Sequence, residues 1–175
     1  MAPAGLRLRS ERPADGPSIR SLNLAAFPTS AEADLVERIR AGGAFRPEHS
    51  LVAQVGTRTV GHLLLSPVTL HTADGPVPVL ALAPMAVLPD HQRRGIGSAL
   101  VTAALDAAEV REEPLVVVLG HPWYYPRFGF RPASRYGIRA PFPVRDEVFM
   151  VKPLTRYRAA LRGRIEYPAA FEGRD

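Results

Sequence analysis

The stretch LAPMAVLPDHQRRGIG, Leu82–Gly97, joins an apolar strand pattern to a basic loop that contains glycine. Its apolar part, Met85–Leu88, has the length and composition of a β-strand. Pro89-Asp90 then marks a turn, because proline fixes φ and aspartate can bond its own backbone. After the loop, an alanine-rich segment from Ser98 to about Val110 predicts a helix. The predicted order is therefore strand, basic loop, helix.

The loop residues themselves suit a phosphorylated ligand. Glycines let the backbone approach a phosphate, and the N–H groups and dipole at a helix start favour an anion. Two arginines add charge and bidentate hydrogen bonds. The stretch lacks the Lys-Ser/Thr pair of a Walker loop and the third glycine of a dinucleotide fingerprint. The alternative is a surface loop whose arginines are only solvated. The loop predicts a site for a phosphorylated cofactor, and the residues behind this prediction are Arg93, Arg94, Gly95 and Gly97.

The spacing Q-x-x-G-x-G, which begins at Gln92 and follows Met85–Pro89, resembles the acetyl-CoA pyrophosphate loop of the GNAT superfamily of N-acetyltransferases. The resemblance implies acetyl-CoA (coenzyme A) as co-substrate. It places the pyrophosphate on the backbone amides of residues 93–98 and the pantetheine on the end of the preceding strand. The implied cofactor-binding residues are Met85, Ala86, Val87, Gln92, Arg93, Arg94, Gly95, Ile96, Gly97, Ser98, Tyr124 and Phe128.

A second stretch, GHPWYYPRFGF at Gly120–Phe130, matches the same superfamily. Tyr125, Gly129 and Phe130 fit its Y-x-x-x-G-F pattern, which ends a short fourth helix and starts the next strand. The whole string resembles a narrower group of predicted acetyltransferases, typified by bacterial YhbS proteins. Together the two motifs cover about residues 82–132, and the rest of the chain agrees in pattern only.

Acetyl transfer to an amine needs a deprotonated amine, a polarised carbonyl and a proton for the leaving thiolate. The chain has no cysteine and no G-x-S-x-G motif, so a direct transfer in a ternary complex is expected. In the resemblance Tyr125 occupies the position of the general acid, and a phenol of pKa about 10 suits a thiolate of pKa about 8.5. The alternative for Tyr125 is a core tyrosine whose hydroxyl already has a partner.

Two residues are candidates for the general base. His121 titrates near neutral pH, although it also fits a role in capping the turn before Pro122. Glu147, near the final predicted strand, could be a base or an anchor for the amine. In the resemblance a chain of water molecules often replaces a dedicated base, so the base is the weakest of these assignments.

The resemblance implies an α/β (α+β) fold of GNAT type, with a mixed, mostly antiparallel central sheet of about seven strands flanked by about four helices. Gly61, in the middle of a predicted strand, indicates a bulge or a close backbone approach. We expect an acetyltransferase domain over residues 1–155. Residues 156–175 would form a C-terminal extension that packs on the domain or on a partner subunit, which leaves a homodimer open. A solvated basic tail is the alternative.

Composition limits the remaining functions. With 175 residues and 46% hydrophobic content, the chain can form a single globular domain. The absence of cysteine excludes disulfides and Cys-based metal sites, and no metal is expected. No apolar run suits a membrane span or a secretory signal, so a cytoplasmic protein is expected.

The net charge of +5 suits an anionic partner, either coenzyme A or nucleic acid. Nucleic acid is disfavoured, since no basic strand with interleaved aromatic residues occurs. An amine acceptor is expected, and a non-catalytic acyl-CoA sensor is the alternative.

Overall fold

The structure, a computed structural model, describes residues 1–173 and divides them into two compact units. Unit 1 comprises residues 1–66, 83–107 and 173, and unit 2 comprises residues 67–82 and 108–172. The helices are α1 (Gly16–Ala26), α2 (Ala31–Ala41) and α3 (Ile96–Val110). The strands are β1 (Leu6–Ser10), β2 (Ser50–Val55), β3 (Arg58–Thr72), β4 (Gly75–Val87), β5 (Leu115–Leu119), β6 (Arg131–Pro132), β7 (Ile138–Arg139), β8 (Phe149–Pro153) and β9 (Gly163–Glu166).

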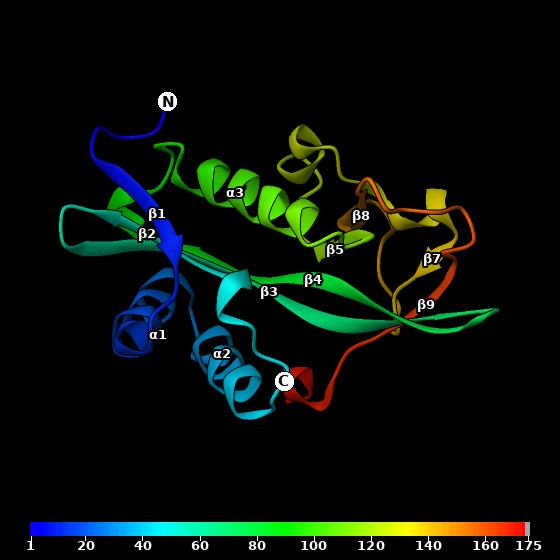
Figure 1. Ribbon diagram of the computed structural model, residues 1–175. Coiled ribbons are helices and arrows are strands. Elements are labelled where there is room, and N and C mark those ends of the chain that lie inside the picture. The colour runs from blue at the N-terminus through cyan, green and yellow to red at the C-terminus, as the bar shows by residue number, and fades with distance from the viewer. Residues whose placement is uncertain (174–175) are drawn as a thin grey trace. The chain divides into compact units, whose positions relative to one another are not determined.

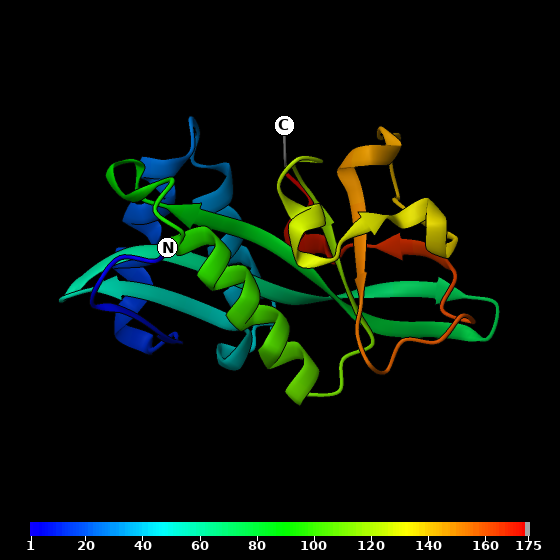
Figure 2. The same ribbon diagram turned by 90° about the horizontal axis from the view of Figure 1, so that it is seen from above.

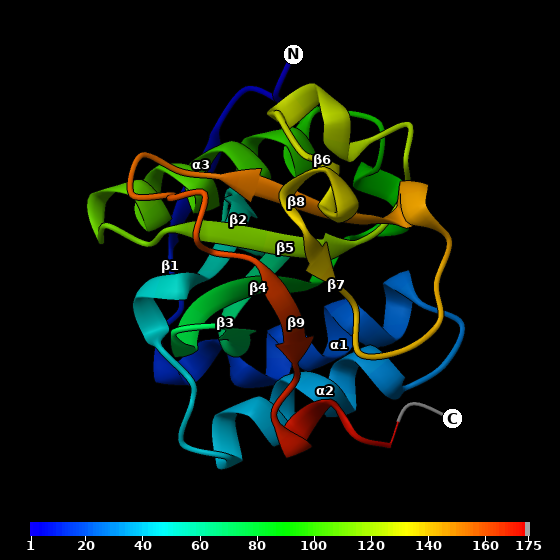
Figure 3. The ribbon, with the colours of Figure 1, turned by 90° about the vertical axis from the view of Figure 1, so that its right-hand side faces the viewer.

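Within residues 1–173 the strands form a mixed, mostly antiparallel sheet of nine strands. In unit 1, β2 pairs antiparallel with both β1 and β3. In unit 2, β5 lies between β4, to which it is parallel, and β8, to which it is antiparallel (Figure 3). The short strand β6 joins β8, and β9 pairs antiparallel with β3 and parallel with β7. The predicted sheet type is confirmed, with nine strands and three α-helices in place of about seven and four.

In unit 1, helices α1 and α2 cover one face of the strands and α3 covers the other (Figure 1). Figure 2, seen from above, shows α3 running across these strands. Gly61 is what lets α3 come so close, because a Cβ there would lie 3.0 Å from Ile96 Cγ2 and 3.0 Å from Leu100 Cδ1. Gly61 also pairs with Ala53, beside a shift in the register of β2 on β3. The structure thus shows both features that a mid-strand glycine indicates.

Unit 2 has a hydrophobic core of its own, built from the strands on both sides of β5 and from the C-terminal segment. Ile165 of β9 is fully buried and pairs with Leu70 of β3. Residues 156–172 of the predicted extension lie in this unit, whereas residues 174–175 lie outside the described part of the chain.

The predicted fourth helix is instead a single 3₁₀ turn, Tyr125–Phe128. Pro126 near its start has no N–H to donate, which limits the number of turns that can form. Gly129 then takes φ +92°, a left-handed conformation that ends the turn. Among residues 1–173, no helix is long and apolar enough to span a bilayer.

Candidate functional site

The predicted phosphate loop lies in unit 1, between the end of β4 and the start of α3. It leaves β4 after Val87 through a 3₁₀ turn at Pro89–His91. The Gln92 side chain reaches back, and its Nε2 donates a hydrogen bond of 3.0 Å to the carbonyl oxygen of Val87. This bond closes the base of the loop, which gives the glutamine of the motif a structural purpose.

The backbone of the loop presents unused donors. Arg93 has φ +58°, which is uncommon for a residue other than glycine, and Gly95 has φ +78°. The first helical bond of α3 runs from Ala99 N–H to the Gly95 carbonyl at 3.0 Å. The amides of residues 96–98 therefore precede the hydrogen-bonded part of the helix and have no acceptor within it. These N–H groups, with the helix dipole, can bind an anion.

The side chains of the loop leave it positively charged. Arg93 and Arg94 are exposed, and neither forms an ion pair with another residue in the described range. The neighbouring Asp90 carboxylate binds His91 Nδ1 at 2.8 Å and Arg58 Nη1 at 3.0 Å. These partners hold the pKa of Asp90 below its ordinary value. The one acid beside the loop is thus already engaged, and the two arginines remain available.

The three predicted cofactor residues of β4 alternate in burial. Ala86 is 3% exposed, whereas Met85 and Val87 are half-buried. The chain is held at this point by a hydrogen bond of 2.9 Å from Leu88 N–H to the Val60 carbonyl of β3. The end of β4 is therefore fixed to its neighbour in unit 1.

The second motif lies in unit 2, where β5 ends at Leu119. Gly120 N–H donates to the Val148 carbonyl at 2.9 Å. A Cβ at Gly120 would stand only 2.3 Å from Tyr125 Cε2, so the tyrosine ring lies directly on the glycine backbone. The role of Gly120 was not foreseen from the sequence. Gly120 is the first residue of the Gly120–Phe130 motif, but the motif does not show which side chain packs against it.

Tyr125 is 7% exposed and packs edge-on against Phe130 and Tyr124, with ring centroids 5.5 Å and 5.1 Å away. Burial, with a smaller contribution from Tyr124, raises the pKa of Tyr125 above its ordinary value. Within residues 1–173 its hydroxyl forms no hydrogen bond. Tyr125 is thus a protonated phenol held by its ring, with a hydroxyl that remains free.

The other aromatic residues of the motif group around Tyr124. Phe128 lies 5.4 Å from its ring, and the Arg127 guanidinium lies 4.6 Å above it. His121 is exposed and stacks on Trp123 at 4.9 Å, and Trp123 itself is 70% exposed. The His121 carbonyl accepts hydrogen bonds from the amides of residues 124 and 125. The structure thus brings Tyr124, Tyr125 and Phe128 together, with His121 joined to them through the backbone.

Glu147 has a different environment. It lies in a 3₁₀ turn, Asp146–Val148, and its carboxylate pairs with Arg145 Nη1 at 3.3 Å. Its side chain is 51% exposed. The turn is tied to Gly120 through Val148, but the Glu147 carboxylate is engaged with an arginine. Its geometry favours an ion pair over a general base.

A cluster of Ser50, His62 and Glu11 in unit 1 was not foreseen from the sequence. Ser50 Oγ lies 2.9 Å from His62 Nε2 and also bonds the Glu11 carboxylate. Both Ser50 and His62 are fully buried, and His62 Nδ1 has no partner among the described residues. A nucleophilic triad needs an accessible serine and a carboxylate on the far nitrogen of the histidine. The cluster therefore stabilises the fold and is no acyl-transfer triad.

No group of three or more potential metal ligands occurs in residues 1–173. The loop offers N–H donors and positive charge, and Tyr125 offers a buried phenol.

Comparison with known proteins agrees with this geometry. Residues 46–132 match the family model of the acetyltransferase (GNAT) domain. The chain is 36% identical over 156 residues to the uncharacterized N-acetyltransferase YjhQ of Escherichia coli K12, with 86% of each chain covered. It is 30% identical over 165 residues to the uncharacterized N-acetyltransferase YhbS of E. coli K12. This alignment covers 94% of this chain and 97% of YhbS.

Two crystal structures resemble the fold. One is a GNAT family N-acetyltransferase, YhbS of E. coli in complex with CoA, with TM-score 0.86, 30% identity and coverage of 100% of this chain and 97% of that one. The other is a GNAT family acetyltransferase of Brucella melitensis in complex with acetyl-CoA, with TM-score 0.78, 28% identity and coverage of 95% and 98%. The length and identity of these matches, together with the two motifs, show that this chain belongs to the GNAT family of N-acetyltransferases.

Proposed function

We propose that this acyltransferase moves an acetyl group from acetyl-CoA directly to a primary amine. The observation that carries the proposal is the loop at residues 92–98, where free helix-start amides lie beside two arginines that have no acidic partner in the described chain. A pyrophosphate needs this combination of N–H donors and positive charge. The crystal structures of the two relatives with CoA and with acetyl-CoA support the same ligand.

Each part of the loop has a role in this proposal. The amides of residues 93–98 bind the pyrophosphate, and Arg93 and Arg94 add charge from the rim. Gln92 holds the loop against Val87. The end of β4, at residues 85–87, offers backbone groups to the pantetheine and polarises the thioester carbonyl. Tyr124 and Phe128 contribute aromatic surface to the cofactor.

Acetyl-CoA supplies an activated acyl group, and its thiolate leaves as the amine attacks. The thiolate then needs a proton, which we assign to the Tyr125 hydroxyl. Burial raises the pKa of Tyr125, so the phenol keeps its proton until it is required. A hydroxyl without a hydrogen-bond partner in the described chain can turn toward the leaving sulfur without breaking an existing bond.

For the base we rank His121 above Glu147. The His121 side chain is exposed, whereas the Glu147 carboxylate is already paired with Arg145. The acceptor is a primary amine, either of a small molecule or of a protein.

Calorimetric titration with acetyl-CoA tests the proposal. Wild type should bind with micromolar affinity, and Gly97→Trp, which places a large ring in the first turn of α3, should abolish the heat of binding. Thr102→Trp adds the same ring at an exposed position of the same helix and should bind like wild type. Absence of binding by wild type would refute the proposal.

A non-catalytic acyl-CoA sensor remains the second candidate, because it would keep the loop and need no Tyr125. Release of free CoA thiol in the presence of a panel of amines separates the two. A sensor binds acetyl-CoA but shows no turnover with any amine, and Tyr125→Phe then changes nothing.

A further inference from the structure

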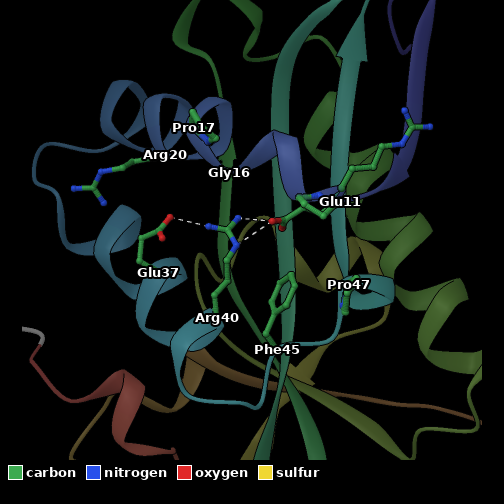
Figure 4. Close-up of a pocket in the computed structure, with 10 residues that line it drawn as sticks. Glu11, Gly16, Pro17, Arg20, Glu37, Arg40, Phe45 and Pro47 are labelled. Carbon is green, nitrogen blue, oxygen red and sulfur yellow. Dashed lines mark hydrogen bonds and ion pairs between the residues drawn. The ribbon is translucent and has the colours of Figure 1, made fainter.

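Unit 1 contains a cavity of about 660 Å³ that takes no part in the proposed acetyl transfer. It is lined by the first turn of α1, the last turns of α2 and the segment that follows α2, with Gly16, Pro17, Glu37, Arg40, Phe45 and Pro47 in its wall (Figure 4). Its volume lies within the range of about 300 to 1,000 Å³ that is typical of small-molecule sites.

The cavity lies on the opposite face of the unit 1 strands from α3. Successive residues of a strand point to opposite faces. Gly61 faces Ile96 and Leu100 of α3, whereas the next residue, His62, meets Ser50 and Glu11 on the other face. Glu11 belongs to the cavity wall. The cavity is therefore separated by the sheet from the helix whose start forms the cofactor loop.

Arg40 is the polar centre of the cavity, and three of the five N–H groups of its guanidinium are bonded to carboxylates. Its Nε and Nη2 donate to Glu11 Oε1 at 2.9 Å and 2.5 Å, and its Nη1 donates to Glu37 Oε1 at 2.7 Å. Figure 4 shows the guanidinium between the two carboxylates. The guanidinium carbon also lies 5.7 Å from the centre of the Phe45 ring. The flat face of a guanidinium stacks on aromatic rings.

This arrangement is fixed before any ligand arrives. Glu11 is 6% exposed, and it also accepts a hydrogen bond from the buried Ser50, which is linked to the buried His62. Burial by itself would raise the pKa of Glu11, but hydrogen bonds from His62 and Ser50 and the charge of Arg40 hold it below its ordinary value. Arg40 is thus bound to a carboxylate that stays ionised. A preorganised group loses little freedom when a ligand binds.

The lining indicates the chemistry of the ligand. Pro17, Phe45 and Pro47 provide flat apolar surface for a ring. Glu37 is 48% exposed, and only its Oε1 is used by Arg40, so Oε2 can accept a further hydrogen bond. Arg12 and Arg20 also line the cavity, so its wall holds three arginines against two glutamates, a net charge of +1. We propose that this cavity is a second ligand site, which binds a small aromatic ring that carries an N–H donor.

The cavity can be filled by a side chain at Gly16. A Cβ there would have no atom within 4 Å, and the only local cost is that of a side chain in the helical conformation directly before Pro17. Gly16→Leu should therefore occupy the cavity, and a cooperative thermal unfolding transition shows that the variant is folded. Ser21→Leu adds the same side chain at an exposed position of α1 outside the cavity wall, and it serves as the matched control.

Indole is the probe, titrated into ¹⁵N-labelled protein of full length and followed by amide chemical shifts. We expect saturable shifts at residues 16, 40 and 45 in wild type and in Ser21→Leu, and their loss in Gly16→Leu. 1-Methylindole, which lacks the N–H, should bind about three- to tenfold more weakly.

Three outcomes would overturn the proposal. They are the absence of shifts in wild type at millimolar indole, equal shifts in Gly16→Leu, and shifts at other residues only. Equal affinity of indole and 1-methylindole would remove the N–H donor from the ligand class. Acetyl-CoA binding and turnover are not part of this readout, so failure of the proposed acetyl transfer would not affect it.

Discussion

The loop at residues 92–98 and the aromatic segment at residues 120–130 present opposite kinds of surface. The loop exposes backbone N–H groups and two free arginines, and Ile96 is its one fully buried side chain. The aromatic segment buries its main side chain: Tyr125 is 7% exposed and lies on the backbone of Gly120. The loop is suited to hold an anion through its main chain, whereas the segment positions one hydroxyl through ring packing.

This difference predicts how the two regions respond to substitution. Binding through main-chain amides tolerates many side-chain changes, provided that the backbone conformation survives. A function that depends on one hydroxyl is lost with that oxygen, and it is equally sensitive to whatever holds the ring. Changes in the segment should therefore affect the rate, and changes in the loop should affect affinity.

The largest effect is expected from Tyr125→Phe. Loss of the proton donor should lower kcat about 10²-fold or more, while the Kd for acetyl-CoA and the unfolding midpoint stay unchanged, because the hydroxyl has no hydrogen-bond partner in the described chain. Steady-state kinetics and calorimetry measure the two quantities. Tyr124→Phe, on the half-buried neighbouring ring, is the control. Equal losses in both variants would show that the segment acts only through packing.

Gly120→Ala should break the ring packing itself. The new methyl would lie 2.3 Å from Tyr125 Cε2, so the ring must move. We expect the free energy of unfolding to fall by about 1 to 3 kcal/mol, with a loss of kcat. Denaturant unfolding measures the first effect. Gly16→Ala makes the same chemical change where a Cβ has open space, so its cost is limited to that of a side chain in the helical conformation before Pro17 and should be smaller than that of Gly120→Ala. A stable, active Gly120→Ala protein would contradict the structure.

Arg93→Ala and Arg94→Ala should each have a smaller effect, limited to affinity. Since the amides carry most of the binding, each variant should raise the Kd for acetyl-CoA by about three- to tenfold, and more at low salt than at high salt. The kcat at saturating acetyl-CoA should be that of wild type. Arg7→Ala, at an exposed position of β1, is the control. A loss of kcat would place these arginines in the chemical step.

The smallest effect concerns the alkaline side of the pH profile. A proton donor works below its pKa, and burial raises the pKa of Tyr125 above its ordinary value. The decrease in kcat that deprotonation of Tyr125 would cause is therefore shifted to higher pH. We expect no decrease in kcat from this residue between about pH 8 and pH 10. A decrease in that range that disappears in Tyr125→Phe would mean that the ring is solvated during turnover.

Much of the fold and one half of the candidate site could be predicted from local sequence. The predicted order of strand, loop and helix is confirmed, and α3 begins at Ile96, before the predicted start at Ser98, and ends at Val110 as predicted. Gly61 in mid-strand correctly indicated a close approach, although only the structure shows that α3 is what approaches. The predicted short fourth helix is present as one 3₁₀ turn, because Pro126 and the left-handed Gly129 leave no room for a longer helix.

The sequence by itself determined the phosphate-loop pattern, the type of sheet and the family, since each depends on residues at short, fixed spacing. Only the tertiary structure decided that Gly120 supports the Tyr125 ring and that Glu147 is engaged by Arg145. It alone assembled the cavity around Arg40, whose partner Glu11 lies 29 positions away in the chain. The contact between Arg40 and Glu11 joins elements that only folding brings together, whereas the other two depend on the geometry of a short turn, which the residue types alone do not specify.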